Sequence, residues 1–222
     1  SFSASVLRKL AAANRRLVVI DHHLSSKRDV ESAPEHVLDV PHSGVVLAWR
    51  FFHPRKAVPL LLKYIEDGDL WRHALPHSDA VSAFRGTYPY DFTVWNRLVR
   101  NFEHPRFREQ GIAYGKVILV YKEQLVEQMA KDATLVKFVG HATYQINSPI
   151  LRSELGHYLC KKRPPIAVVW WDKGTTRSFS LRSNGKVNVA KIAARFGGGG
   201  HRAAARFSFP GSRRLPWKQM PT

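Results

Sequence analysis

The chain has little cysteine, few acidic residues and no long apolar run. Cys160 is its single cysteine among 222 residues, which excludes an internal disulfide framework and suits a reducing compartment. No apolar run approaches the roughly 18 residues that a membrane-spanning helix needs, so we expect no membrane span. Apolar residues still make up 44% of the sequence, enough to bury a core in one large domain or two small ones.

The few acidic residues are unevenly placed. The sequence has 17 Asp and Glu against 35 Lys and Arg, a net charge of +18. Residues 1–110 hold 16 basic and 12 acidic residues, whereas residues 111–222 hold 19 basic and 5 acidic residues, a net +14. Segregated positive charge of this kind predicts attraction to polyanions, above all nucleic acid. The alternative interpretation is a basic surface that serves solubility alone.

The order of elements predicts an α/β protein. An amphipathic helix over 5–14 precedes an apolar strand over 17–20, and this strand stops at Asp21. Such a pattern is typical of a parallel sheet, in which sites gather at the carboxyl ends of strands. We expect a partial first domain over 1–113, a connecting helix over 114–133, a smaller α/β domain over 134–209 and a basic tail over 210–222.

Further helices and strands follow from hydrophobic periodicity and turn residues. Ser43 is the expected N-cap of a helix that ends near Phe52. Residues 24–42 are polar, and we expect an irregular segment there. Residues 85–111 show no clear period. The other expected helices cover 59–66, 114–132, 152–162 and 189–196, and the other expected strands cover 135–139, 142–146, 166–171, 177–182 and 207–209.

Asp21-His22-His23 places one carboxylate and two imidazoles in one tight turn. A neutral imidazole can bind Mn, Fe, Co or Zn, and a neighbouring carboxylate can orient it. The second imidazole, when protonated, can hold a phosphate oxygen. A chance pair of histidines is the alternative interpretation.

Asp67-Gly68-Asp69 places two carboxylates after an apolar helix. The glycine permits a tight turn that would aim one carboxylate inward. The alternative is a helix end with two exposed acids.

Four glycines, 197–200, precede His201. Without Cβ atoms, their backbone amides can approach an anion closely. Residues 203–205 are alanines that could start a helix with a phosphate-binding N-terminus, while His201 and Arg202 add donors. The alternative is a flexible linker.

In this order, the motifs resemble those of the DHH phosphoesterase superfamily with its DHH-associated C-terminal domain. This superfamily includes RecJ-like exonucleases, oligoribonucleases, cyclic-dinucleotide phosphodiesterases and family II pyrophosphatases. The resemblance spans nearly the whole chain and rests on Val18-Val19-Ile20-Asp21-His22-His23, Tyr64-Ile65-Glu66-Asp67-Gly68-Asp69-Leu70-Trp71, Ser153-Glu154-Leu155-Gly156-His157, Ser180-Leu181-Arg182-Ser183 and Phe196 through Ala205.

The resemblance implies a role for each matching residue. His22 would be a metal ligand with Asp21 as its orienting partner, and His23 would contact phosphate. Either Asp67 or Asp69 would supply a further metal ligand. The implied reaction is hydrolysis at a two-metal manganese site with a bridging water as nucleophile. The phosphates or terminal nucleotide of the substrate would be bound by Arg182, Ser183, Gly198, Gly199, Gly200, His201 and Arg202.

The sequence also departs from the family pattern. Members carry an earlier motif with one His and two Asp, and then a further Asp, and neither motif is in this sequence. Ser1-Phe2-Ser3 aligns just past that further Asp, so we expect an N-terminally truncated domain with an incomplete metal site. Ala203 and Arg206 stand where the family has Asn and Gly.

Three hypotheses follow. The first is a non-catalytic, RNA-binding homologue within a larger ribonucleoprotein, such as a mitochondrial ribosome or its assembly intermediate. We expect this protein in the mitochondrial matrix, or otherwise in the cytoplasm. The second is an active manganese-dependent phosphodiesterase on short oligonucleotides whose further motifs lie outside this chain; without them no cofactor is expected. The third is a scaffold that docks protein partners through residues 24–56 and 85–111.

Overall fold

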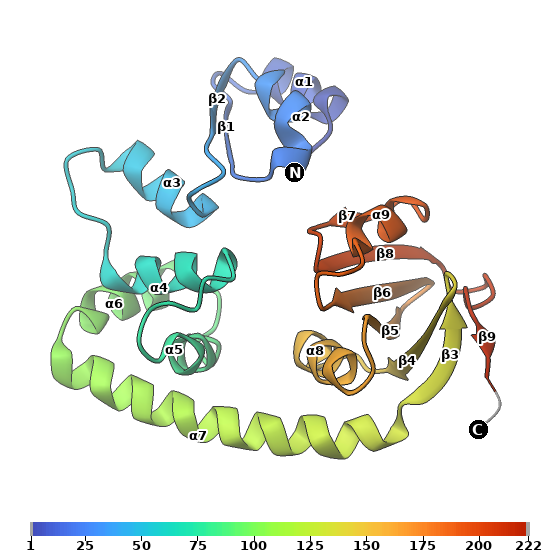
Figure 1. Cartoon of the computed structure of the whole chain (residues 1–222). Coiled ribbons are helices and arrows are strands. Elements are labelled where there is room, and N and C mark those ends of the chain that lie inside the picture. The colour runs from blue at the N-terminus through green and yellow to red at the C-terminus, as the bar shows by residue number, and fades with distance from the viewer. Residues whose placement is uncertain (1, 221–222) are drawn as a thin grey trace. The chain divides into compact units, whose positions relative to one another are not determined.

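The computed structural model describes residues 2–220. The chain folds into two compact units, Ser1–Leu119 and Val120–Thr222, and the boundary falls inside the long helix α7 (Pro105–Met129) (Figure 1). Each unit is described by itself. None of the helices in residues 2–220 has both the length and the apolar character that a membrane crossing requires.

The first unit is mainly helical, with one pair of short strands. In chain order its elements before α7 are α1 (Ala4–Ala13), β1 (Val18–Asp21), the 3₁₀ turn η1 (Leu24–Ser26), α2 (Lys27–Glu31), β2 (Glu35–Leu38), α3 (Gly44–Phe52), α4 (Leu60–Asp69), α5 (Ser78–Arg85) and α6 (Phe92–Phe102).

Strands β1 and β2 pair in parallel, with Asp21 opposite Leu38. Figure 1 shows the pair beside α1 and α2. The expectation of an irregular segment over 24–42 is wrong, because it contains η1, α2 and β2. The sequence of β2, Glu-His-Val-Leu, has no apolar run, so its strand conformation depends on pairing with β1.

The helices α4, α5 and α6 share one apolar core, with Leu61, Val81, Phe84, Leu98 and Phe102 buried at its centre. Residues 85–111, whose sequence shows no clear period, contain α6 and the start of α7. Asp91 caps α6 by accepting a hydrogen bond from the Val94 amide at 2.9 Å.

Helix α7 begins at Pro105, well before the start near Tyr114 that the sequence predicts. Two glycines inside a helix usually destabilise it. In α7 they lie where the helix packs closely against a neighbouring helix. A Cβ at Gly111 would lie 2.7 Å from the Phe84 ring, and one at Gly115 would lie 2.0 Å from the Ala80 carbonyl oxygen. The glycines therefore let α7 pack closely on α5.

The second unit is a seven-stranded mixed sheet with helices on both faces. The strand order is β7-β8-β6-β5-β4-β3-β9, and β4 and β5 are its parallel pair. After α7 its elements are the 3₁₀ turn η2 (Ala130–Asp132), β3 (Thr134–Phe138), β4 (His141–Asn147), α8 (Arg152–Lys162), β5 (Ile166–Lys173), β6 (Thr176–Ser183), α9 (Val189–Ala194), β7 (Gly199–Gly200), β8 (Ala204–Pro210) and β9 (Lys218–Gln219).

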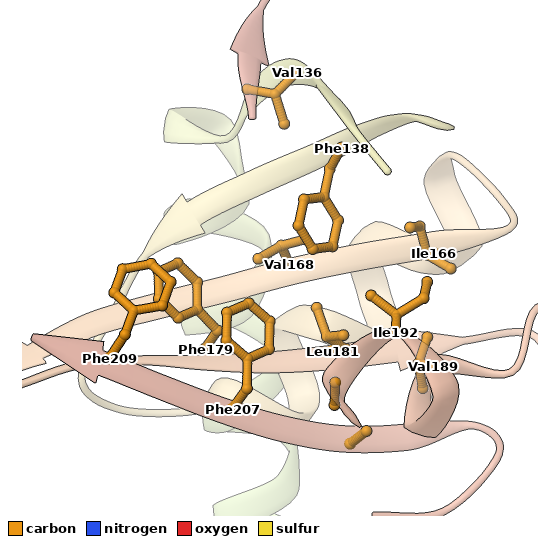
Figure 2. Close-up of a cluster of buried hydrophobic side chains, with 12 residues drawn as sticks. Val136, Phe138, Ile166, Val168, Phe179, Leu181, Val189, Ile192, Phe207 and Phe209 are labelled. Carbon is orange, nitrogen blue, oxygen red and sulfur yellow. The ribbon is translucent and has the colours of Figure 1, made fainter. Parts of the chain in front are cut away.

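Alternate residues of the central strands point to opposite faces of this sheet. One face carries an aromatic-rich core in which the rings of Phe179 and Phe207 stack with centroids 4.5 Å apart, and α9 adds Val189 and Ile192 (Figure 2). The other face packs against α8, with Leu155 fully buried. The predicted α/β fold class is confirmed.

One expectation for the end of the chain is wrong. Residues 203–205 do not start a helix, because β8 begins at Ala204 and its alternating Ala205, Phe207 and Phe209 join the core. Within the basic tail, β9 pairs with β3 and Trp217 packs on the aromatic core.

Candidate functional site

Asp21-His22-His23 lies at the carboxyl end of β1, where the sequence predicts it. The Asp21 Oδ1 atom accepts hydrogen bonds from the amides of His22 at 2.7 Å and His23 at 3.0 Å. The same oxygen lies 2.7 Å from Nδ1 of the His23 ring. Because an ionised carboxylate only accepts, Nδ1 carries the proton in this contact. Asp21 therefore fixes the turn and orients His23.

The imidazole of His22 meets an acid from a different element. Its Nε2 atom lies 3.4 Å from Oδ2 of Asp69, the last residue of α4. The His22 side chain is only 10% exposed, and its ring lies 4.2 Å from the His23 ring. The structure thus brings Asp21, His22, His23 and Asp69 together.

Helix α4 is held against α3 through Glu66. One Glu66 carboxylate oxygen accepts a 2.8 Å hydrogen bond from the amide of Ser43, the N-cap of α3. Because Glu66 and Asp69 are three residues apart, they share one face of α4. The contact to Ser43 therefore also fixes the side of α4 from which Asp69 reaches His22.

Asp67 has a different environment. Its side chain is buried, and its two oxygens accept hydrogen bonds from the amides of Ala74 at 2.9 Å and Leu75 at 3.2 Å. Burial opposes ionisation, but the hydrogen bonds from the Ser78 hydroxyl and these amides outweigh it and hold the pKa of Asp67 below its ordinary value. Asp67 organises the loop after α4, whereas Asp69 faces His22.

The acidic pair does not form the tight turn that the sequence predicts, because Asp67, Gly68 and Asp69 are the last residues of α4. The tight backbone follows them. Trp71, His73 and His77 have φ values of 55°, 47° and 61°, in the left-handed region that non-glycine residues rarely adopt. The buried Asp67 carboxylate stabilises this loop.

The donor set fits a divalent transition-metal ion. Asp21, His22 and His23 each offer one ligand atom, and these atoms lie within 4.8 Å of one another. Two ligand atoms that are each about 2.1 Å from one ion lie about 3.0 Å apart at a right angle and about 3.4 Å apart at a tetrahedral angle. The 3.4 Å between His22 Nε2 and Asp69 Oδ2 agrees with this spacing. His22 and Asp69 would therefore hold the ion.

A second polar cluster, at the same end of the β1–β2 pair, was not predicted from the sequence. Asp39, just after β2, donates its amide to the Asp21 carbonyl oxygen, and its Oδ2 lies 2.7 Å from His42 Nδ1. His42 Nε2 lies 2.9 Å from a guanidinium nitrogen of Arg50. Because arginine only donates, Nε2 accepts in this contact. This cluster could have been predicted if β2 had been recognised as a strand, because Asp39 follows its carboxyl end.

The glycine run differs from a free loop. Gly199 and Gly200 form β7 and pair with Arg206 and Ala205 of β8. A Cβ at Gly198 would lie 2.1 Å from the Arg206 carbonyl oxygen, whereas one at Gly199 would meet nothing within 4 Å. Gly198 is therefore required by chain packing, and Gly199 is the glycine of the pair with open space beside it.

Arg182 lies between α8 and the sheet. Its guanidinium donates to the Ser153 hydroxyl at 2.7 Å and to the Ser180 hydroxyl at 3.2 Å. A Cβ at Gly156 would lie 2.7 Å from the Arg182 side chain, so this glycine gives Arg182 its space. Burial lowers the pKa of Arg182, and the positive charge of Arg206 adds to this effect.

Ser183 and Arg202 both contact the turn around Gly185. The Ser183 hydroxyl donates to the Val187 carbonyl at 2.7 Å and accepts the Gly185 amide at 3.1 Å. Arg202 donates to the Gly185 carbonyl at 2.9 Å. The exposed His201 donates its amide to the Ala204 carbonyl at 2.8 Å. Phosphate contacts by these side chains stay predictions.

Comparison with known sequences identifies a relative in Acanthamoeba polyphaga mimivirus. It is an uncharacterised protein that is 27% identical over 223 residues, covering 95% of this chain and 52% of the relative. The chain spans about half the length of this curated relative.

Comparison with solved structures identifies a shared fold. A DHH domain described as a member of the s1p family of ribosomal proteins matches with a TM-score of 0.60 at 16% identity, covering 94% of this chain and 63% of that chain. A pGpG-specific phosphodiesterase from Vibrio cholerae matches with a TM-score of 0.43 at 14% identity, covering 91% of this chain and 83% of that chain. The second score is too low to argue a common fold.

A family model matches the second unit directly. Residues 132–217 match the DHHA1 domain, a range that runs from the end of η2 to Trp217 beside β9. Together with the fold shared with a DHH domain, this match agrees with the order of motifs in the sequence. Residues 132–217 of the chain thus match the DHHA1 domain, the C-terminal domain of the superfamily that the sequence motifs resemble.

Proposed function

We propose that the chain is an RNA-binding protein of the DHH superfamily that works within a larger ribonucleoprotein. The observation that carries this proposal is the charge of residues 111–222, with 19 basic and 5 acidic residues. Two of those acids, Glu154 and Asp172, are already paired with Lys122 and Arg177. The remaining positive charge favours a polyanion, and the ribosomal-protein description of one fold relative supports RNA as that polyanion.

Binding of a labelled single-stranded RNA, followed by fluorescence anisotropy across a range of salt concentrations, tests this proposal. We expect the logarithm of the affinity to fall linearly with the logarithm of the salt concentration, because bound cations are released from the phosphates. Poly-glutamate serves as a polyanion without phosphates. Equal affinity for poly-glutamate and RNA would contradict a role in RNA binding.

The ribonucleoprotein we propose is mitochondrial, in keeping with the basic, Ser- and Ala-rich composition of residues 2–13. Co-sedimentation of the tagged protein with mitochondrial ribosomal particles would support this placement. Recovery of the protein only in the cytosol would contradict it.

A second candidate function is metal-dependent phosphodiester hydrolysis on short oligonucleotides. It is favoured by the approach of His22 Nε2 to Asp69 Oδ2 at 3.4 Å. A divalent ion such as Mn²⁺, when bound, would polarise a phosphoryl oxygen and lower the pKa of a bound water. His22 and Asp69 would hold the ion, Asp21 would keep the turn in place, and His23 would face the phosphate.

Manganese titration by calorimetry, combined with an assay on short oligonucleotides, distinguishes the two candidates. We expect His22→Gln and Asp69→Asn each to abolish manganese binding, and the exposed control Asp132→Asn to keep it. Turnover by the complete protein would favour the hydrolase. Manganese binding without turnover would favour the non-catalytic RNA-binding protein.

A further inference from the structure

The side of the DHHA1 sheet that faces α8 continues beyond the helix as an exposed surface. Phe207 of β8 joins the opposite, aromatic core, so Arg206 and Ser208 project on the α8 side. Helix α8 packs on β4, β5 and β6, and both Arg206 and Ser208 are exposed. The β8 strand therefore offers polar side chains beside the helix.

Two arginines from different elements stack on one tryptophan at this place. The guanidinium carbon of Arg152, the first residue of α8, lies 4.1 Å from the ring centroid of Trp171, and that of Arg206 lies 5.5 Å from it. Trp171 is only 8% exposed, so it is a fixed platform. One guanidinium nitrogen of Arg152 already donates to the Pro149 carbonyl oxygen at 2.7 Å, which helps to fix the side chain. A guanidinium that rests its face on an aromatic ring still presents its other N–H groups at its edge and loses little freedom on binding.

Negative charge at this surface is scarce. The acid that acts on the neighbouring Arg182 is Glu154, which is already paired with Lys122 at 3.1 Å. Within residues 2–220, the side chain of Arg206 contacts the Trp171 ring and makes no side-chain hydrogen bond or ion pair. Helix α8 also begins without a side-chain cap, so its first-turn amides add partial positive charge. The guanidinium groups of Arg152, Arg182 and Arg206 thus lie on a surface whose nearby carboxylate, that of Glu154, already pairs with a lysine.

We propose that Arg152 and Arg206, stacked on Trp171, bind backbone phosphate of the RNA strand, with Arg182 completing the positive surface. This inference rests on the proposed RNA binding and names the residues that carry it. Planar guanidinium edges match the oxygens of a phosphodiester group. Arg206 stands where the family resemblance expects glycine, so this stacked pair is a feature of this chain rather than a consequence of its DHHA1 fold.

The test compares two charge-matched double variants in the full chain. Arg152→Gln with Arg206→Gln removes the stacked pair, whereas Lys191→Gln with Arg195→Gln removes two exposed charges at α9, on the other face of the sheet. Affinity for a labelled single-stranded RNA is measured against salt. We expect the stacked-pair variant to bind roughly tenfold more weakly and to lose about 0.7 from its salt slope for each phosphate contact removed.

The α9 variant should keep a slope near that of the wild-type protein. Thermal unfolding of both variants verifies the fold, and Arg206→Lys, which keeps the charge but not the planar fork, should bind with intermediate affinity. Equal weakening by the two double variants would overturn the phosphate assignment and leave the proposed RNA binding standing. Absence of RNA binding by the wild-type protein would overturn both.

Discussion

The Nε2 atom of His22 lies 3.4 Å from the Oδ2 atom of Asp69, which joins the end of β1 to the end of α4. The nearby Asp67, two residues earlier on α4, instead hydrogen-bonds the loop that follows the helix. Two acids in one helical turn thus belong to two different networks, and substitutions can separate them.

We expect Asp67→Asn to destabilise the fold by about 2 kcal/mol, because buried amides and a hydroxyl lose a charged acceptor. Asp69→Asn should change the free energy of unfolding by less than about 1 kcal/mol, since the Asp69 side chain is 48% exposed. Urea denaturation of both variants measures the difference. Equal costs would show that Asp67 has no special role in the loop.

The Asp67 carboxyl should also make stability depend on pH. Its pKa is lower in the folded state than the ordinary value near 3.8, so its contribution is complete above that value and is lost as the pH falls through the folded pKa. The stability difference between wild type and Asp67→Asn should be constant from about pH 7 to pH 5 and shrink below about pH 4. A difference that stays the same at pH 3 and pH 7 would contradict this assignment.

The glycine run offers a matched pair of substitutions. A Cβ at Gly198 would lie 2.1 Å from a backbone oxygen, which cannot move aside like a side chain, so Gly198→Ala should cost about 3 kcal/mol. Gly199→Ala has open space and should change stability by about 0.5 kcal/mol or less. Comparing the two urea midpoints checks the prediction, and similar midpoints would refute close packing at Gly198.

Cys160 should react slowly with thiol reagents. It is 4% exposed, and burial raises the pKa of its thiol, which reduces the reactive thiolate at neutral pH. We expect native protein at pH 7.5 to react with an aromatic disulfide at least about a hundredfold more slowly than unfolded protein. Reaction at the rate of an unfolded chain would mean that Cys160 is accessible.

Local signals predicted the elements that depend on local sequence. Ser43 caps α3 by accepting the Val46 amide at 3.4 Å, and α8 spans Arg152–Lys162 as periodicity predicts. The predictions failed where contacts between residues far apart in the sequence determine the structure. Strand β2 needs β1 beside it, and the roles of Asp67 and Asp69 depend on how α4 meets Ser43 and His22. Charge totals likewise predicted a basic unit but could not show that two arginines share one tryptophan.

The two-residue length of β7 and β9 has a consequence for self-association. These strands occupy the two edges of the seven-stranded sheet. Short edges with charged neighbours give another sheet few backbone groups to pair with, which protects against edge-to-edge aggregation. Loss of residues 215–220 would remove β9 and leave the five residues of β3 as an unprotected edge, so we expect a chain without this segment to associate with its own copies more readily.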